Sequence, residues 1–149
     1  MKFWIFFLVL IFAVSFAFSQ NLFAGLEMSG GFLGIGGGID TPHAVIGVSF
    51  VSLMTAYGFT DIGVNFTNIL GNLYNNDNLR ITYGWTALFD LATGYSYTTF
   101  GFGVGGSLIE HWKIQNIPLL FRQTLSINTS LISMGAFSIG TNLGFYYEF

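Results

Sequence analysis

Residues 138–149 read Ser138-Ile139-Gly140-Thr141-Asn142-Leu143-Gly144-Phe145-Tyr146-Tyr147-Glu148-Phe149. One alternating set is mostly apolar, namely Ile139, Thr141, Leu143, Phe145, Tyr147 and Phe149. The residues between them are small or polar, apart from Tyr146. Because successive side chains of a strand point to opposite faces, the stretch predicts a β-strand with one apolar and one small polar face. Such a strand is the repeating unit of a membrane-spanning β-barrel.

The same residues resemble the C-terminal signal strand of bacterial outer-membrane proteins, which ends in Phe with an aromatic residue two positions earlier. Phe149 and Tyr147 occupy these positions here, and Phe145 continues the same face. The resemblance implies a small outer-membrane barrel of the OmpA/OmpX/OmpW-like class. It also implies that membrane lipids and the barrel-assembly machinery are partners, the latter through Phe145, Tyr147 and Phe149.

Residues 1–19 have the pattern of a signal peptide. Met1-Lys2 is a short positive segment, an unbroken apolar run follows, and Ala17-Phe18-Ser19 places small residues at the two positions that a signal peptidase reads. The apolar segment is shorter than the roughly 20 residues needed to span a bilayer as a helix. We therefore expect cleavage before Gln20 and one barrel domain over residues 20–149, located in the bacterial outer membrane.

The composition is unusual for a soluble domain. Charged residues make up 7% of the chain, against roughly 25% in a typical soluble domain. There is no Cys, which excludes disulfides and thiolate metal sites, and the net charge of −3 gives no footprint for nucleic acid. The hydrophobicity after residue 19 is spread through short alternating segments, so a closed barrel is the membrane structure that fits.

Alternation between turn signals predicts eight strands within residues 22–29, 32–39, 45–55, 61–67, 80–91, 97–107, 119–131 and 138–149. The predicted fold is all-β, an antiparallel up-and-down transmembrane β-barrel. We expect the last strand to close the barrel by pairing with residues 119–131 and with the strand that begins near Leu22. Segments 71–78 and 109–117 are predicted to be loops on the periplasmic side, although barrels of this class carry short turns there.

Small and polar residues are predicted to face the lumen, and this face contains a polar cluster of charged residues: Glu27, Asp61, Arg80, Asp90, Arg122 and Glu148. We expect Arg122 to lie opposite Tyr146 and diagonal to Glu148, and Asp90 to face Tyr97. The structural interpretation is that these charges neutralise one another inside a filled barrel. The functional alternative is a path for protons or ions.

No catalytic, cofactor-binding or metal-binding residue is predicted. His43 and His111 are expected in solvated turns or loops. The chain resembles lipid A deacylase barrels in size alone, because neither His is followed two residues later by the Ser of that family. Residues 101–106 match the dinucleotide motif G-x-G-x-x-G, but they lie inside a predicted strand, where Gly permits tight curvature.

Eight strands leave an interior that side chains can fill, so a general porin is not expected. The sequence therefore favours a non-enzymatic barrel with a structural, envelope-stabilising or adhesive role. Two alternatives stay open: a narrow channel for ions or small apolar solutes, and an outer-membrane lipid-modifying enzyme.

Overall fold

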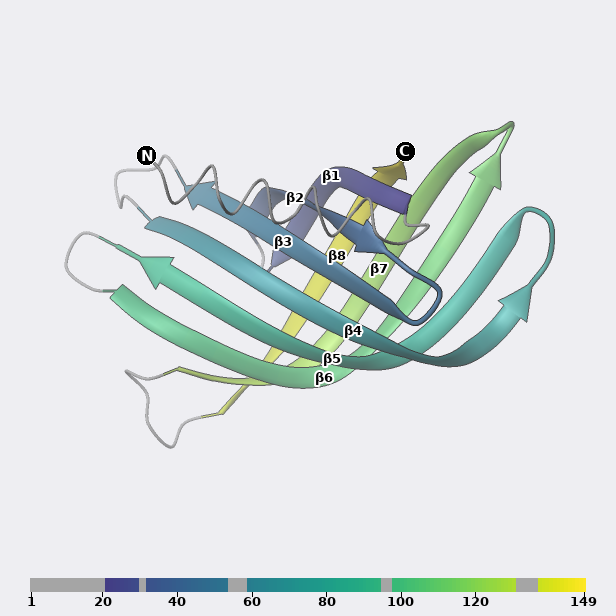
Figure 1. Cartoon of the computed structure of the whole chain (residues 1–149). Coiled ribbons are helices and arrows are strands. Elements are labelled where there is room, and N and C mark those ends of the chain that lie inside the picture. The colour runs from purple at the N-terminus through teal and green to yellow at the C-terminus, as the bar shows by residue number, and fades with distance from the viewer. Residues whose placement is uncertain (1–20, 30–31, 54–58, 95–97, 131–136) are drawn as a thin grey trace.

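The computed structural model describes residues 21–29, 32–53, 59–94, 98–130 and 137–149, which form a closed β-barrel (Figure 1). Its strands are β1 (Asn21–Ser29), β2 (Phe32–Asp40), β3 (Ala44–Leu53), β4 (Phe59–Asn75), β5 (Leu79–Thr93), β6 (Thr98–Ile114), β7 (Ile117–Ser130) and β8 (Ser138–Glu148). Each strand pairs antiparallel with its neighbours in the chain, and β1 pairs with β8. The prediction of an all-β, eight-stranded, up-and-down barrel is confirmed. The predicted signal peptide over residues 1–19 lies outside the described residues.

The last strand closes the barrel by the pairing that the sequence predicts. On one side β8 pairs with β7, from Leu119 opposite Tyr147 onward, and on the other side it pairs with β1. The Phe149 N–H continues this second ladder by donating a 2.7 Å hydrogen bond to the Leu22 carbonyl. No edge strand remains in a closed barrel, so the backbone groups of β1 and β8 are satisfied without water.

The two predicted loops are wrong for most of their length. β4 continues to Asn75 and β6 to Ile114, so residues 76–78 and the pair Gln115-Asn116 are all that remain as turns. Gln115 and Asn116 both have positive φ, 50° and 69°, as a tight two-residue hairpin turn requires. The Asn-rich segment after Ile69 stays extended because β4 keeps pairing with β5 through two register shifts, which act as bulges.

The connections differ between the two ends of the barrel. We call the end at which Asn21 begins β1 and Glu148 ends β8 the terminal end, and the opposite end the far end. The described connections of the terminal end are short turns, the arrangement typical of the periplasmic side of such barrels. The β4–β5 and β6–β7 hairpins extend past the shorter strands at this end (Figure 1).

The two faces of the wall have opposite character. Exposed side chains on the outside are large and apolar, including Leu26, Ile35, Val64, Phe89, Val104, Leu125 and Phe145. Buried side chains on the inside are largely polar or charged, including Glu27, Asn65, Thr67, Thr86, Arg122 and Thr124. A water-soluble barrel has the reverse arrangement, because it hides apolar surface from water. Among the described residues, no helix is long and apolar enough to cross a membrane.

Candidate functional site

The interior is held by a buried cluster around Arg122, which projects inward from β7. Its Nη2 donates to Glu27 Oε1 at 2.9 Å and to the Tyr146 hydroxyl at 2.8 Å, and its Nη1 donates to Asn65 Oδ1. Tyr146 in turn donates to Glu27 Oε2 at 2.8 Å. All four side chains are at least 97% buried. The cluster thus links β1, β4, β7 and β8 across the lumen by charge-assisted hydrogen bonds.

The register of Arg122 differs from the predicted one. Arg122 lies opposite Gly144, and Tyr146 lies opposite Leu120, so the predicted Arg122–Tyr146 pair across β7 and β8 is wrong by two residues. The phenol nevertheless reaches Arg122 diagonally, because Gly144 leaves the space open: a Cβ on Gly144 would collide with the Tyr146 hydroxyl. Gly47 makes similar room on β3, since its Cβ would lie 2.7 Å from Asn65 Oδ1.

A chain of hydroxyl groups continues the polar interior around the barrel. Thr67 Oγ1 lies 2.8 Å from Thr86 Oγ1, which bonds to Ser107 Oγ, and Ser107 Oγ lies 2.6 Å from Thr124 Oγ1. These four buried residues come from β4, β5, β6 and β7 in order. Each hydroxyl can donate once and accept, so the chain satisfies its members without water.

An apolar layer lies between this polar interior and the terminal end. Its buried members are Phe23, Val45, Ile109, Leu120 and the ring of Tyr146. Phe23 and Tyr146 pack edge to face with ring centroids 4.8 Å apart, a favourable aromatic geometry. Val45, Ile109 and Leu120 are fully buried. Water therefore does not reach these side chains.

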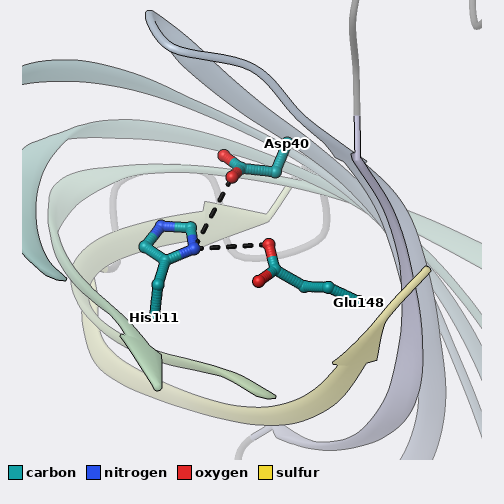
Figure 2. A group of neighbouring side chains, drawn as sticks. All are labelled: Asp40, His111 and Glu148. Atoms are coloured by element: carbon teal, nitrogen blue, oxygen red, sulfur yellow. Dashed lines mark hydrogen bonds and ion pairs between the residues drawn. The ribbon is translucent and has the colours of Figure 1, made fainter. Parts of the chain in front are cut away.

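A second polar cluster lies at the terminal end, and Figure 2 shows three of its side chains, Asp40, His111 and Glu148. His111 Nδ1 lies 3.3 Å from Glu148 Oε1 and 3.6 Å from Asp40 Oδ2. Arg80 Nη2 lies 3.1 Å from His111 Nε2 and 3.4 Å from Asp40 Oδ2. The side chains come from β2, β5, β6 and β8, at or near the strand ends, so the barrel wall itself positions all four.

The hydrogen bonds of His111 indicate which ring nitrogen carries the imidazole proton. Arg80 can only donate, so Nε2 accepts its hydrogen bond and Nδ1 carries the imidazole proton. That N–H points to the carboxylates of Glu148 and Asp40. Asp40 Oδ1 is buried and has no hydrogen-bond partner among the residues that the structure describes.

The prediction that His111 lies in a loop is wrong, because β6 is longer than expected. Along β6, Ser107, Ile109 and His111 alternate on the inner face, which places the imidazole inside the barrel mouth. His43, by contrast, is exposed in the turn between β2 and β3, as predicted. The alternation that starts at Ser107 predicts that His111 faces the lumen if the strand continues, but the polar residues around His111 are typical of a loop.

Asp61 and Asp90 lie on the inner face toward the far end. Asp61 is opposite Ala92, so the two carboxylates occupy diagonal positions on neighbouring strands. Asp90 is opposite Gly101 on β6, so the predicted contact with Tyr97 is wrong, and Tyr97 itself lies outside the described residues. Within the described part of the chain, Asp61 and Asp90 have no ion-pair partner.

The six predicted lumen charges therefore lie in three places, of which the first is the pair Asp61 and Asp90 toward the far end. Glu27 and Arg122 meet in the central cluster, and Arg80 and Glu148 belong to the cluster at the terminal end, where His111 and Asp40 join them. Two partners were not predicted from the sequence: Asp40, which lies just beyond the predicted strand 32–39, and Asn65, which meets Arg122 from a strand that is not its neighbour. Neither could be paired without the register of non-adjacent strands.

The aromatic residues of the last strand point away from the lumen. Phe145 and Tyr147 are about half exposed and Phe149 is 73% exposed. The rings of Tyr147 and Phe149 pack edge to face with centroids 5.1 Å apart. These residues thus form one aromatic strip on the outer surface of β8 at the terminal end.

The clusters offer limited catalytic chemistry. A His beside two carboxylates can act as a general base, but covalent hydrolysis also needs a nucleophile within hydrogen-bond reach of it. The hydrogen bonds described for His111 go to Arg80 and Glu148, and none comes from a hydroxyl group. The arrangement is better suited to binding a cation than to activating a nucleophile.

Comparison with known proteins adds no family to this description. No protein-family model matches the chain, and a search of curated protein sequences finds no match.

Proposed function

We propose that the protein is an integral outer-membrane β-barrel whose role is structural, stabilising the envelope or presenting a surface for adhesion, with a lumen that does not conduct. The single observation that carries the proposal is the inverted polarity of the wall. Apolar side chains cover its outside, and the Arg122 cluster and hydroxyl chain fill its inside. Such a wall is favourable in lipid and costly in water.

Strand length supports the membrane assignment. β1, β2, β3 and β8 have 9, 9, 10 and 11 residues. A strand tilted by about 45° needs roughly 9–11 residues to cross the hydrocarbon core of a bilayer. The four longer strands can cross the same core and extend beyond it at the terminal end.

The filled interior supports a structural role over a channel. On β6, Ile109 separates His111 from Ser107, and on β8 the ring of Tyr146 lies next to Glu148. The apolar layer thus interrupts the polar groups between the terminal end and the central cluster. Thr82 on β5 lies opposite Ile109, but its hydroxyl already donates to the Ile109 carbonyl. An ion crossing the layer would therefore lose its hydration for little polar compensation, which is costly.

The test is reconstitution of the purified protein in lipid vesicles loaded with an ion-sensitive dye. Insertion is verified first, by protection of the barrel from protease and by a shift of gel mobility on heating. We expect inserted protein to leave the ion flux at the level of empty vesicles. A flux that rises with the amount of inserted protein would overturn the closed-lumen role, and failure to insert would overturn the membrane assignment.

A further inference from the structure

We propose that Asp40, His111 and Glu148 form a binding site for a divalent transition-metal ion, with Zn²⁺ as the reference ion. The three side chains reach the same point from β2, β6 and β8 at the terminal mouth of the barrel (Figure 2). Each offers one donor atom, and these three atoms lie within 4.8 Å of one another.

The separations fit first-row metal coordination. Bonds of about 2.1 Å at tetrahedral angles place two ligand atoms about 3.4 Å apart. His111 Nδ1 lies 3.3 Å from Glu148 Oε1 and 3.6 Å from Asp40 Oδ2, so both distances are close to this ligand–ligand separation. The two carboxylate oxygens lie within 4.8 Å of each other. Three protein ligands leave a fourth position for water.

The carboxylate of Asp40 is an independent sign of a missing partner. Asp40 is 3% exposed, and its Oδ1 has no hydrogen-bond partner in the part of the chain that the structure describes. The carboxylate points toward the imidazole of His111 (Figure 2). The proposed ligand atom is the other oxygen, Oδ2, which faces His111 Nδ1. A buried carboxylate with one oxygen unpartnered is costly, and a cation bound at Oδ2 would compensate the charge of the carboxylate as a whole.

The net charge of the cluster also favours a bound cation. Asp40 and Glu148 contribute two negative charges, neutral His111 none, and Arg80 one positive charge. Without a metal the cluster therefore carries one net negative charge in the mouth of the barrel. A divalent ion bound to the two carboxylates neutralises both and makes Arg80 superfluous for charge balance.

Arg80 is the natural competitor of the metal. Its N–H donates to His111 Nε2, which keeps the imidazole proton on Nδ1, the atom that would bind the ion. Metal binding at Nδ1 moves this proton to Nε2 through exchange with water, where it faces the Arg80 donor. Arg80 must then withdraw, and its side chain, 37% exposed at the edge of the cluster, can do so into solvent.

The donor set favours a transition metal over calcium. Imidazole with two carboxylates suits Zn²⁺ and its neighbours, whereas Ca²⁺ takes six to eight oxygen ligands. Strand positions hold the donors more rigidly than a loop would, so little ordering is needed on binding.

The experiment is calorimetric titration of the folded protein in detergent micelles with ZnCl₂, after removal of metals by a chelator. We expect one ion per chain. His111→Gln, Glu148→Gln and Asp40→Asn should each weaken binding by at least about tenfold. His43→Gln removes the other His of the chain, exposed in the β2–β3 turn, and should leave the affinity unchanged.

Arg80→Gln gives the sharper result, because it removes the competitor and keeps the three ligands. We expect it to strengthen Zn²⁺ binding severalfold, whereas loss of a merely structural ion pair would not. Heat-dependent gel mobility verifies that every variant is folded. The proposal is overturned if the wild type binds no Zn²⁺, if the three ligand variants bind as well as the wild type, if Arg80→Gln binds more weakly, or if Ca²⁺ binds as tightly as Zn²⁺.

Discussion

Replacing Arg122 by Leu should destabilise the barrel far more than an ordinary surface substitution. Arg122 is 2% exposed and donates to Asn65, Glu27 and Tyr146. Removing one partner of a buried ion pair costs about 3–5 kcal/mol, because the other charge stays buried and unpaired. Tyr146 still donates to Glu27 in the variant, so we expect the lower part of this range, about 3 kcal/mol.

The assay is urea unfolding of the protein in lipid vesicles, followed by Trp fluorescence. With a urea dependence of about 2 kcal/mol per molar, the midpoint should fall by about 1.5 M. Lys113→Leu is the matched control, since Lys113 is an exposed cation on β6 and a surface substitution of this kind changes the free energy of unfolding by less than about 0.5 kcal/mol. The double variant Arg122→Leu with Glu27→Leu removes both charges and should recover most of the loss.

Two outcomes would refute this reasoning. A shift of the midpoint by less than about 0.5 M for Arg122→Leu would mean that the cluster does not hold the barrel together. A double variant less stable than Arg122→Leu alone would mean that the cost does not come from the unpaired carboxylate of Glu27.

The same unfolding assay tests three further features of the wall. Gly25→Ala should lower the free energy of unfolding by about 1–3 kcal/mol, because its Cβ would meet the backbone of β8. Gly106→Ala should change it by less than about 0.5 kcal/mol, because its Cβ would make only an ordinary contact, 3.9 Å from the Gly84 carbonyl oxygen. Thr86→Val breaks the buried hydroxyl chain and should lower the free energy of unfolding by about 1–3 kcal/mol. Thr141→Val on the exposed face should leave it unchanged. Equal effects of the two variants would contradict a stabilising role of the hydroxyl chain. Val104→Arg on the outer face of β6 should cost about 2–4 kcal/mol in vesicles, and a tolerated Arg would show that this face is not in lipid.

The fold could be predicted from the sequence because the alternation of apolar and polar residues identifies the strands and their two faces. Most strands alternate between apolar residues on one face and small or polar residues on the other, and the pattern around Phe145 and Leu125 assigns the outer face correctly. The ends of the strands could not be predicted as well. The Asn-rich segment after Gly71 has loop composition, yet it stays extended because a neighbouring strand pairs with it.

The clusters were harder to predict for a physical reason. Arg122 meets Glu27 from a strand 95 residues away in the chain, and His111 meets Asp40 and Glu148 across the mouth. These contacts depend on the relative shift of all the strands around the barrel. A single error of two residues, as between β7 and β8, changes which residues of β8 and β1 lie nearest to Arg122.

The most direct test of the central claim, that the apolar outer face lies in lipid, is fluorescence quenching of Trp85 in vesicles of brominated lipid. Trp85 is exposed on the outer face in the middle of β5. With Trp4 and Trp112 replaced by Phe, it is the remaining Trp of the chain. We expect bromine atoms near the middle of the acyl chains to quench it strongly and aqueous acrylamide to have little effect. Efficient quenching by acrylamide with none by brominated lipid would contradict the account.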